Sequence, residues 1–116
     1  MAEAPTKHPK ILYAMLRHTE DGAKLRELLS DHLEWMRGNE KAGRVFLSGP
    51  TEPSAGSGLN GLTIIEASSR EAADALAQQD PLIRAGAVTY SMHTWNVNEG
   101  RIALTLYLSD QSASLG

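Results

Sequence analysis

The order of its apolar segments is the feature that most constrains how this chain folds. Four short segments rich in strand-forming residues lie at 10–16, 44–47, 62–67 and 87–97. Two segments with helical spacing, 23–39 and 68–79, connect the first strand to the second and the third to the fourth. Short apolar runs bounded by turn residues are typical of buried strands. The chain therefore predicts the order strand, helix, strand, strand, helix, strand.

Each predicted helix carries its own signals. The first has one apolar stripe, formed by Leu25, Leu28, Leu29, Leu33 and Met36. The second begins with a capping box, in which Ser68 is the N-cap and Glu71 the third helical residue. Its inner stripe consists of residues that are mostly small, which allows a close approach to a sheet: Ala72, Ala73, Leu76 and Ala77.

The order β-α-β-β-α-β is the ferredoxin-like arrangement. This α+β fold has an antiparallel sheet with two helices on one face. The other sheet face then has no cover within the chain, and an apolar sheet face has to pack against something. A second copy of the same sheet is the simplest partner, so we expect a homodimer through the sheet faces, with a higher oligomer left open.

With 116 residues the chain is long enough for one domain. Residues 1–9 are polar and aperiodic, which predicts a flexible N-terminal arm before a domain at 10–97. The segment 51–61 is rich in glycine, proline and serine and predicts a flexible loop. Residues 98–116 are expected to add a C-terminal strand at 102–108 and a frayed tail, because the apolar residues there alternate: Ile102, Leu104, Leu106 and Leu108.

Composition excludes several classes of function. The net charge is −3 and the basic residues are scattered, which argues against nucleic-acid binding. The chain has no cysteine, so disulfides, thiolate metal sites and cysteine nucleophiles are absent. No apolar run approaches the roughly 18 residues of a membrane span, and no signal-peptide pattern precedes residue 10. We therefore expect a cytoplasmic protein. No metal site or cofactor is expected either, because neither ligand spacing nor a phosphate-binding loop is recognisable.

His32 and Asp80 are the candidate catalytic residues. His32 follows Leu28 by four residues and Leu29 by three, so it lies on the apolar stripe of its helix. Asp80 closes the second predicted helix, where a carboxylate opposes the helix dipole. A turn at Asp80-Pro81 or a partner such as His32 would offset this. From spacing alone, a hydrogen-bonded core histidine is the simplest interpretation of His32. As a pair, the carboxylate would fix the imidazole tautomer and let the other nitrogen move protons.

Three further residues are candidates for substrate binding. Trp35 follows His32 by three residues and shares a flank of the helix with it. Tyr13 lies on the first strand and could form a pocket wall. For both, ordinary core packing is the alternative. Ser48 belongs to Ser48-Gly49-Pro50, which is expected to end the second strand because proline cannot continue a central ladder. It lacks the esterase nucleophile pattern and is a candidate pocket donor.

Three short motifs in this order resemble those of the YciI-like proteins, small members of the dimeric α/β-barrel group. They are His32-Leu33 on the first helix, Leu47-Ser48-Gly49-Pro50 ending the second strand, and Asp80-Pro81 with Ala85-Gly86 after the second helix. The resemblance covers about 10–97. Leu82 departs from it, because relatives usually have an aromatic residue after Asp-Pro. The segment 98–116 lies outside the minimal domain.

The resemblance implies a ferredoxin-like fold that dimerises through its sheets, with His32 and Asp80 as the active-site pair. It also implies a function, since similar proteins include dehydrochlorinases of chlorinated hydroxyhydroquinones and isomerases of muconolactone. We therefore expect a cofactor-free enzyme that transfers protons on a small cyclic or aromatic metabolite, best described as a dehydrochlorinase in aromatic degradation. The alternatives are a muconolactone-type isomerase, a non-catalytic dimer that binds small molecules, and a dimer in which the pair only stabilises the fold.

Overall fold

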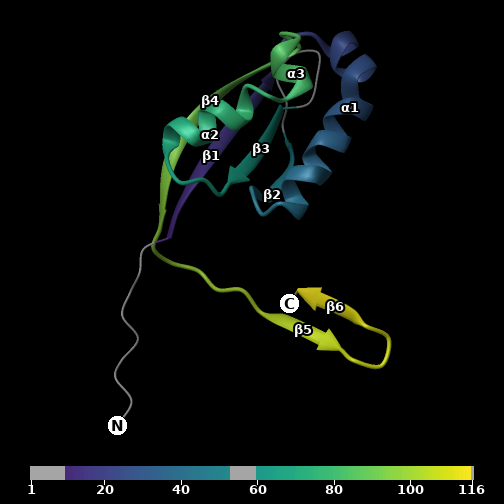
Figure 1. Cartoon of the computed structure of the whole chain (residues 1–116), viewed down its shortest axis with the longest axis vertical. Coiled ribbons are helices and arrows are strands. Elements are labelled where there is room, and N and C mark those ends of the chain that lie inside the picture. Colours follow the sequence, from purple (N-terminus) through teal and green to yellow (C-terminus); the bar gives the residue numbers. More distant parts are fainter. Residues whose placement is uncertain (1–9, 53–59, 116) are drawn as a thin grey trace.

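A four-stranded sheet with helices on one face forms the body of the molecule, as the computed structural model shows (Figure 1). The structure describes residues 10–52 and 60–115. The elements, in chain order, are β1 (Lys10–Thr19), α1 (Gly22–Lys41), β2 (Val45–Thr51), β3 (Asn60–Ile65), α2 (Arg70–Ala77), α3 (Pro81–Arg84), β4 (Val88–Val97), β5 (Leu104–Tyr107) and β6 (Ser112–Leu115). The sheet order is β2-β3-β1-β4 with antiparallel neighbours throughout. The predicted α+β, ferredoxin-like fold is therefore confirmed.

The two faces of the sheet have different environments. Along β1, Tyr13 and Met15 face the helices, and they pack with Ile65, Met92, Ala73, Leu76 and Ala77 in the main core cluster. Arg17 follows on the same face, because side chains alternate along a strand. The opposite face carries Leu12 and Leu16, and no helix of the described residues lies over it (Figure 1). The core thus lies between the sheet and the helices.

Strand β2 is longer than the sequence predicts. Pro50 pairs with Gly61 and Thr51 with Asn60, so Ser48-Gly49-Pro50 does not end the strand. The prediction is wrong because β2 lies at the edge of the sheet, with β3 as its one neighbour. An edge strand tolerates proline, since one of its sides makes no ladder hydrogen bonds. Ser48 consequently lies within a strand.

The second predicted helix is two helices. The first, α2, ends at Ala77, and the four-residue α3 begins at Pro81. The N-cap of α2 is Ser69, whose side chain accepts a hydrogen bond from the backbone N–H of Ala72 at 3.0 Å. The predicted cap, Ser68, is one residue too early.

Because Ser69 caps α2, we expect Ser69→Ala to lower the free energy of unfolding by about 1 kcal/mol. The control Ser68→Ala removes an exposed hydroxyl next to it and is expected to change stability by less than about 0.5 kcal/mol. Urea denaturation of both variants measures the difference. Equal losses for the two variants would contradict the assignment of the cap.

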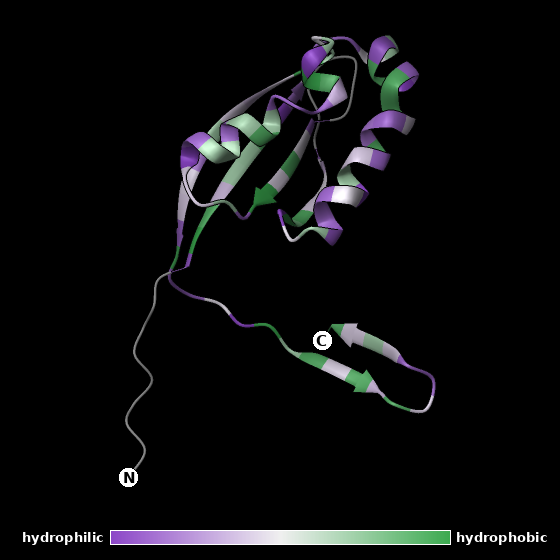
Figure 2. Cartoon of the chain, viewed as in Figure 1, coloured by the Kyte–Doolittle hydropathy of each residue, from purple (hydrophilic) through white to green (hydrophobic). Residues whose placement is uncertain are grey.

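The C-terminal segment forms a separate hairpin rather than one strand and a frayed tail. β5 and β6 pair with each other and with no strand of the main sheet (Figure 1). All residues from 98 to 115 are exposed. Along β5, apolar and polar residues alternate (Figure 2), and the register places Leu104 and Leu106 opposite Leu115 and Ala113. The hairpin therefore has one apolar face, and none of the other residues that the structure describes packs on it.

Two predicted features lie outside the described residues: the arm at 1–9 and most of the loop at 51–61, of which 53–59 are not described. Among the residues that are described, no helix has the length and apolar character needed to cross a membrane.

Candidate active site

A cavity of about 530 Å³ opens between α1, β2 and the start of α3. Most of its walls are apolar: Leu25, Leu29, Leu33 and Met36 from α1, Val45, Phe46 and Leu47 from β2, and Leu82 from α3. Arg17, His32 and Ser48 are polar groups in the same lining. Leu29 and Leu33, predicted to lie on a core stripe, are exposed because this part of α1 faces the cavity. A ring-sized ligand fits a site of this volume and character.

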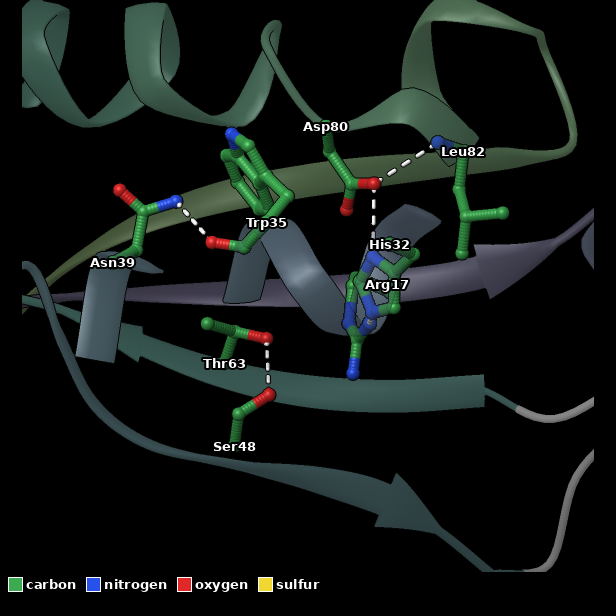
Figure 3. A network of polar contacts seen from close by, with 8 residues as sticks. All are labelled: Arg17, His32, Trp35, Asn39, Ser48, Thr63, Asp80 and Leu82. Carbon is green, nitrogen blue, oxygen red and sulfur yellow. Dashed lines mark hydrogen bonds and ion pairs between the residues drawn. The ribbon is translucent and has the colours of Figure 1, made fainter. Parts of the chain in front are cut away.

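His32 and Asp80 form a buried pair beside this cavity (Figure 3). His32 Nδ1 lies 2.9 Å from Asp80 Oδ1, and the two residues are 5% and 1% exposed. The structure thus brings together the two residues that the sequence singles out. Buried polar groups need such partners, because an unpaired one loses its hydration without compensation.

Asp80 occupies a different helix position from the predicted one. It is the N-cap of α3, with Pro81 in the first turn, and its Oδ1 also accepts the backbone N–H of Leu82 at 2.9 Å. A carboxylate is favourable at a helix N-terminus, so the dipole argument made for the C-terminus of the preceding helix is wrong. Asp80 therefore holds α3 and His32 through the same oxygen atom.

Arg17 completes the polar group and was not identified from the sequence. Its Nη1 lies 3.3 Å from His32 Nε2 (Figure 3). Arginine has donors and no acceptor, so Nε2 accepts in this contact and a neutral His32 carries its proton on Nδ1, facing Asp80. A signal for Arg17 was present, because it follows Tyr13 and Met15 on the apolar face of β1. A charged side chain on that face has to meet a polar partner.

The three residues predicted to bind substrate differ in whether they line the cavity. Ser48 lines the cavity, and its Oγ lies 2.8 Å from Thr63 Oγ1 on the adjacent strand. Trp35 is half-buried against the core, with its ring centroid 6.4 Å from that of His32, and does not line the cavity. Tyr13 is buried in the core cluster and does not line it either. Of these three, only Ser48 can contact a ligand there.

Arg17 is a partly buried cation. Burial lowers the pKa of its guanidinium from the usual value, and the Asp80 carboxylate partly opposes this change.

The remaining titratable candidates lie away from the cavity: Asp31, His18 and His93 are exposed. Within 10–52 and 60–115, no three His, Asp or Glu side chains gather as a metal site would require. The site as it stands offers acid–base chemistry from His32, a carboxylate that orients it, and a cation beside it.

Fold and site together define a small α+β protein with a histidine–aspartate pair at an apolar cavity. The model of the YCII-related domain matches residues 11–96, and the chain belongs to this family. A comparison with curated proteins finds no match.

One solved structure similar to this chain is 5-chloro-2-hydroxyhydroquinone dehydrochlorinase from Burkholderia phenoliruptrix AC1100, in complex with 2,5-dihydroxybenzoquinone. The TM-score is 0.63 at 19% sequence identity, and the match covers 75% of this chain and 95% of that one. At this identity the likeness supports the fold.

Proposed function

We propose that this protein is a cofactor-free enzyme in which His32 and Asp80 transfer protons on a small oxygenated ring. The observation that carries the proposal is the 2.9 Å contact between His32 Nδ1 and Asp80 Oδ1 at the wall of a ring-sized cavity. This contact engages one imidazole nitrogen and leaves Nε2 on the other side of the ring. An imidazole oriented in this way can act as a general base and, once protonated, as a general acid.

Dehydrochlorination of a chlorinated hydroxyhydroquinone is the reaction we favour. His32 would pass a proton from a ring hydroxyl to the ring carbon that bears chlorine. It would then remove the proton of a second hydroxyl conjugated with that carbon. The electron pair left on this oxygen moves through the ring and expels chloride. The products are a hydroxyquinone, one proton and one chloride ion, so the reaction needs no oxidant.

Chloride release from 5-chloro-2-hydroxyhydroquinone tests this function. We expect the purified protein to release one chloride per hydroxyquinone formed, above the rate in buffer. Ion chromatography and the quinone absorbance follow the two products independently. Quinone formation without chloride would indicate autoxidation. Chloride release no faster than in buffer would refute the dehydrochlorinase assignment.

The alternatives differ in what they predict. A muconolactone-type isomerase would shift a proton and a double bond without releasing chloride. A binding module would show saturable binding without a product. In a purely structural role for the pair, substitutions of His32 would change stability and leave ligand binding unaffected. The apolar cavity beside His32 favours the first two over the last.

A homodimer through the open sheet faces is our proposal for the assembly. Leu16, Leu47 and Trp95 are 47%, 58% and 44% exposed and lie on the face without helices. Aligned sheets pack about 10 Å apart, so a second copy of this face would bury these side chains. The stem at 98–103 can span about 20 Å, which is enough to carry the apolar face of the β5–β6 hairpin onto the second copy. An isolated hairpin is marginally stable in water, so it needs such a surface.

In this assembly, Leu16→Glu places a charge in the interface and is expected to give a monomer. Gln79→Glu adds the same charge at an exposed position on the helix side and should leave the dimer intact. Sedimentation velocity at micromolar concentration measures both. A second variant with serine at Leu104 and Leu106 removes the apolar hairpin face and should weaken the dimer. A monomeric wild-type protein, or a dimer that Leu16→Glu does not disturb, would contradict the proposal.

A further inference from the structure

Arg17 is a cation on the helix side of the sheet, and no carboxylate in the described part of the chain pairs with it directly. In residues 10–52 and 60–115 the ion pairs are Lys10–Glu66, His18–Glu20 and His32–Asp80. Arg17 belongs to none of them, and Asp80 is separated from it by the His32 ring. A half-buried charge without a direct counter-charge is unfavourable, because it has lost part of its hydration.

The donors of Arg17 are under-used. Arginine has five N–H groups, and among the described residues its side chain makes one hydrogen bond, to His32 Nε2. At 3.3 Å to a neutral acceptor this contact is long for a charge-assisted hydrogen bond. Its Nε is buried, and no acceptor for it lies among residues 10–52 and 60–115. The guanidinium therefore has donor capacity left beside the cavity that it lines.

Gly61 makes room for this guanidinium. A Cβ at position 61 would lie 2.5 Å from Arg17 Nη2 and 3.0 Å from Cζ. Any other residue at position 61 would therefore push the end of the arginine side chain aside. The glycine thus leaves the space that the guanidinium occupies.

We propose that Arg17 binds an ionised oxygen of the substrate, so that the cavity selects small rings that carry a phenolate or enolate over neutral rings of the same shape. This inference rests on the proposed function and names its substrate class. The apolar walls, among them Phe46 and Leu82, accommodate the ring. The oxyanion supplies the counter-charge that Arg17 lacks, in a site where charge-assisted hydrogen bonds are strong.

Binding of the oxyanion also prepares His32. When Arg17 donates to the substrate, its contact with His32 Nε2 is exchanged for a stronger one. The Nε2 lone pair is then available next to the bound ring, while Nδ1 remains fixed by Asp80. Arg17 is thus a specificity residue that couples the presence of an anionic substrate to the release of the base.

A matched pair of ligands tests the inference. 2,5-Dihydroxybenzoquinone carries ionised enol oxygens at neutral pH, and 2,5-dimethoxybenzoquinone has the same ring without them. We expect the wild-type protein to bind the ionised compound at least 10-fold more tightly by isothermal titration calorimetry. Arg17→Met should weaken binding of this compound by about 10- to 100-fold and leave the dimethoxy compound within about 3-fold.

Two further variants add a second test and a control. Gly61→Ala keeps Arg17 but displaces its guanidinium, and we expect a several-fold loss for the ionised compound alone. Arg70→Met removes an exposed arginine at the start of α2 that does not line the cavity, and should change neither affinity. Circular dichroism checks folding. If Arg17→Met does not fold, Gly61→Ala and Arg17→Lys carry the test.

Equal affinity of the wild-type protein for the two compounds would overturn the inference. So would a preference for the ionised compound that survives both Arg17→Met and Gly61→Ala. The failure of the proposed reaction is a separate outcome, because these measurements do not require turnover. A preference that depends on Arg17 in a protein without dehydrochlorinase activity would support the inference and refute the enzyme.

Discussion

Replacing His32 by glutamine is expected to lower the rate of chloride release by about 10²- to 10⁴-fold, the usual contribution of a positioned general acid–base. The glutamine amide is similar in size and polarity to imidazole, but it neither accepts nor releases protons near neutral pH. The loss should therefore lie in kcat, with a smaller change in the affinity for 2,5-dihydroxybenzoquinone. Steady-state kinetics and calorimetry on the same preparation separate the two effects.

The control for this variant is His93→Gln. His93 is exposed on β4, with its Nε2 3.0 Å from Ser91 Oγ, and lies away from the cavity on the open face of the sheet. Because this is the proposed dimer face, sedimentation velocity checks that the variant keeps the wild-type assembly. We expect it to retain the wild-type rate. A His32→Gln protein that folds and keeps more than about one tenth of the wild-type rate would refute the role of His32. A loss confined to affinity would favour the binding module.

Asp80→Ala is expected to lower the free energy of unfolding by about 3–5 kcal/mol. The substitution removes one oxygen that serves two buried donors, His32 Nδ1–H and the backbone N–H of Leu82, each at 2.9 Å. Both donors would remain unpaired, and α3 would lose its N-cap. Small domains are stable by about 5–15 kcal/mol, so a large part of the stability depends on this side chain.

Asp80→Asn is the matched variant. Its amide oxygen can still accept from Leu82 and His32, so we expect it to lose much less stability than alanine does. It removes the negative charge that stabilises a protonated His32, and activity should fall by more than about 10-fold. Urea denaturation and steady-state rates measure the two effects. Full activity in Asp80→Asn, or a loss below about 1 kcal/mol in Asp80→Ala, would contradict this role of Asp80.

The sequence predicts the order of the elements well because each long element carries its own pattern. The continuous apolar run of β1 and the small inner stripe of α2 agree with the burial of Met15, Ala73 and Ala77. The helix α3 has four residues and is too short to show a helical period, so the sequence pattern includes the segment after Ala77 in the preceding helix. For the same reason it places Asp80 at the wrong end of a helix, although Asp80 does contact the predicted partner, His32.

Contacts between distant segments are harder to predict than periods. Arg17 and His32 meet only because β1 and α1 pack together, and no local pattern records their spacing. Spacing from His32 makes Trp35 a pocket candidate and position on the first strand makes Tyr13 one, each with core packing as the alternative. The structure packs both against the core. The alternation of Leu104 and Leu106 predicts a strand correctly. It does not show that the strand pairs with 112–115 rather than with the sheet.

The tautomer and ligand response of His32 test the central claim most directly, because this measurement does not depend on identifying the substrate. A long-range ¹H–¹⁵N correlation spectrum distinguishes a protonated nitrogen of histidine from an unprotonated one. We predict that His32 is neutral with its proton on Nδ1, and that 2,5-dihydroxybenzoquinone shifts its Nε2 resonance. A proton on Nε2 of the neutral ring, or a His32 signal that the ligand leaves unchanged, would contradict the account.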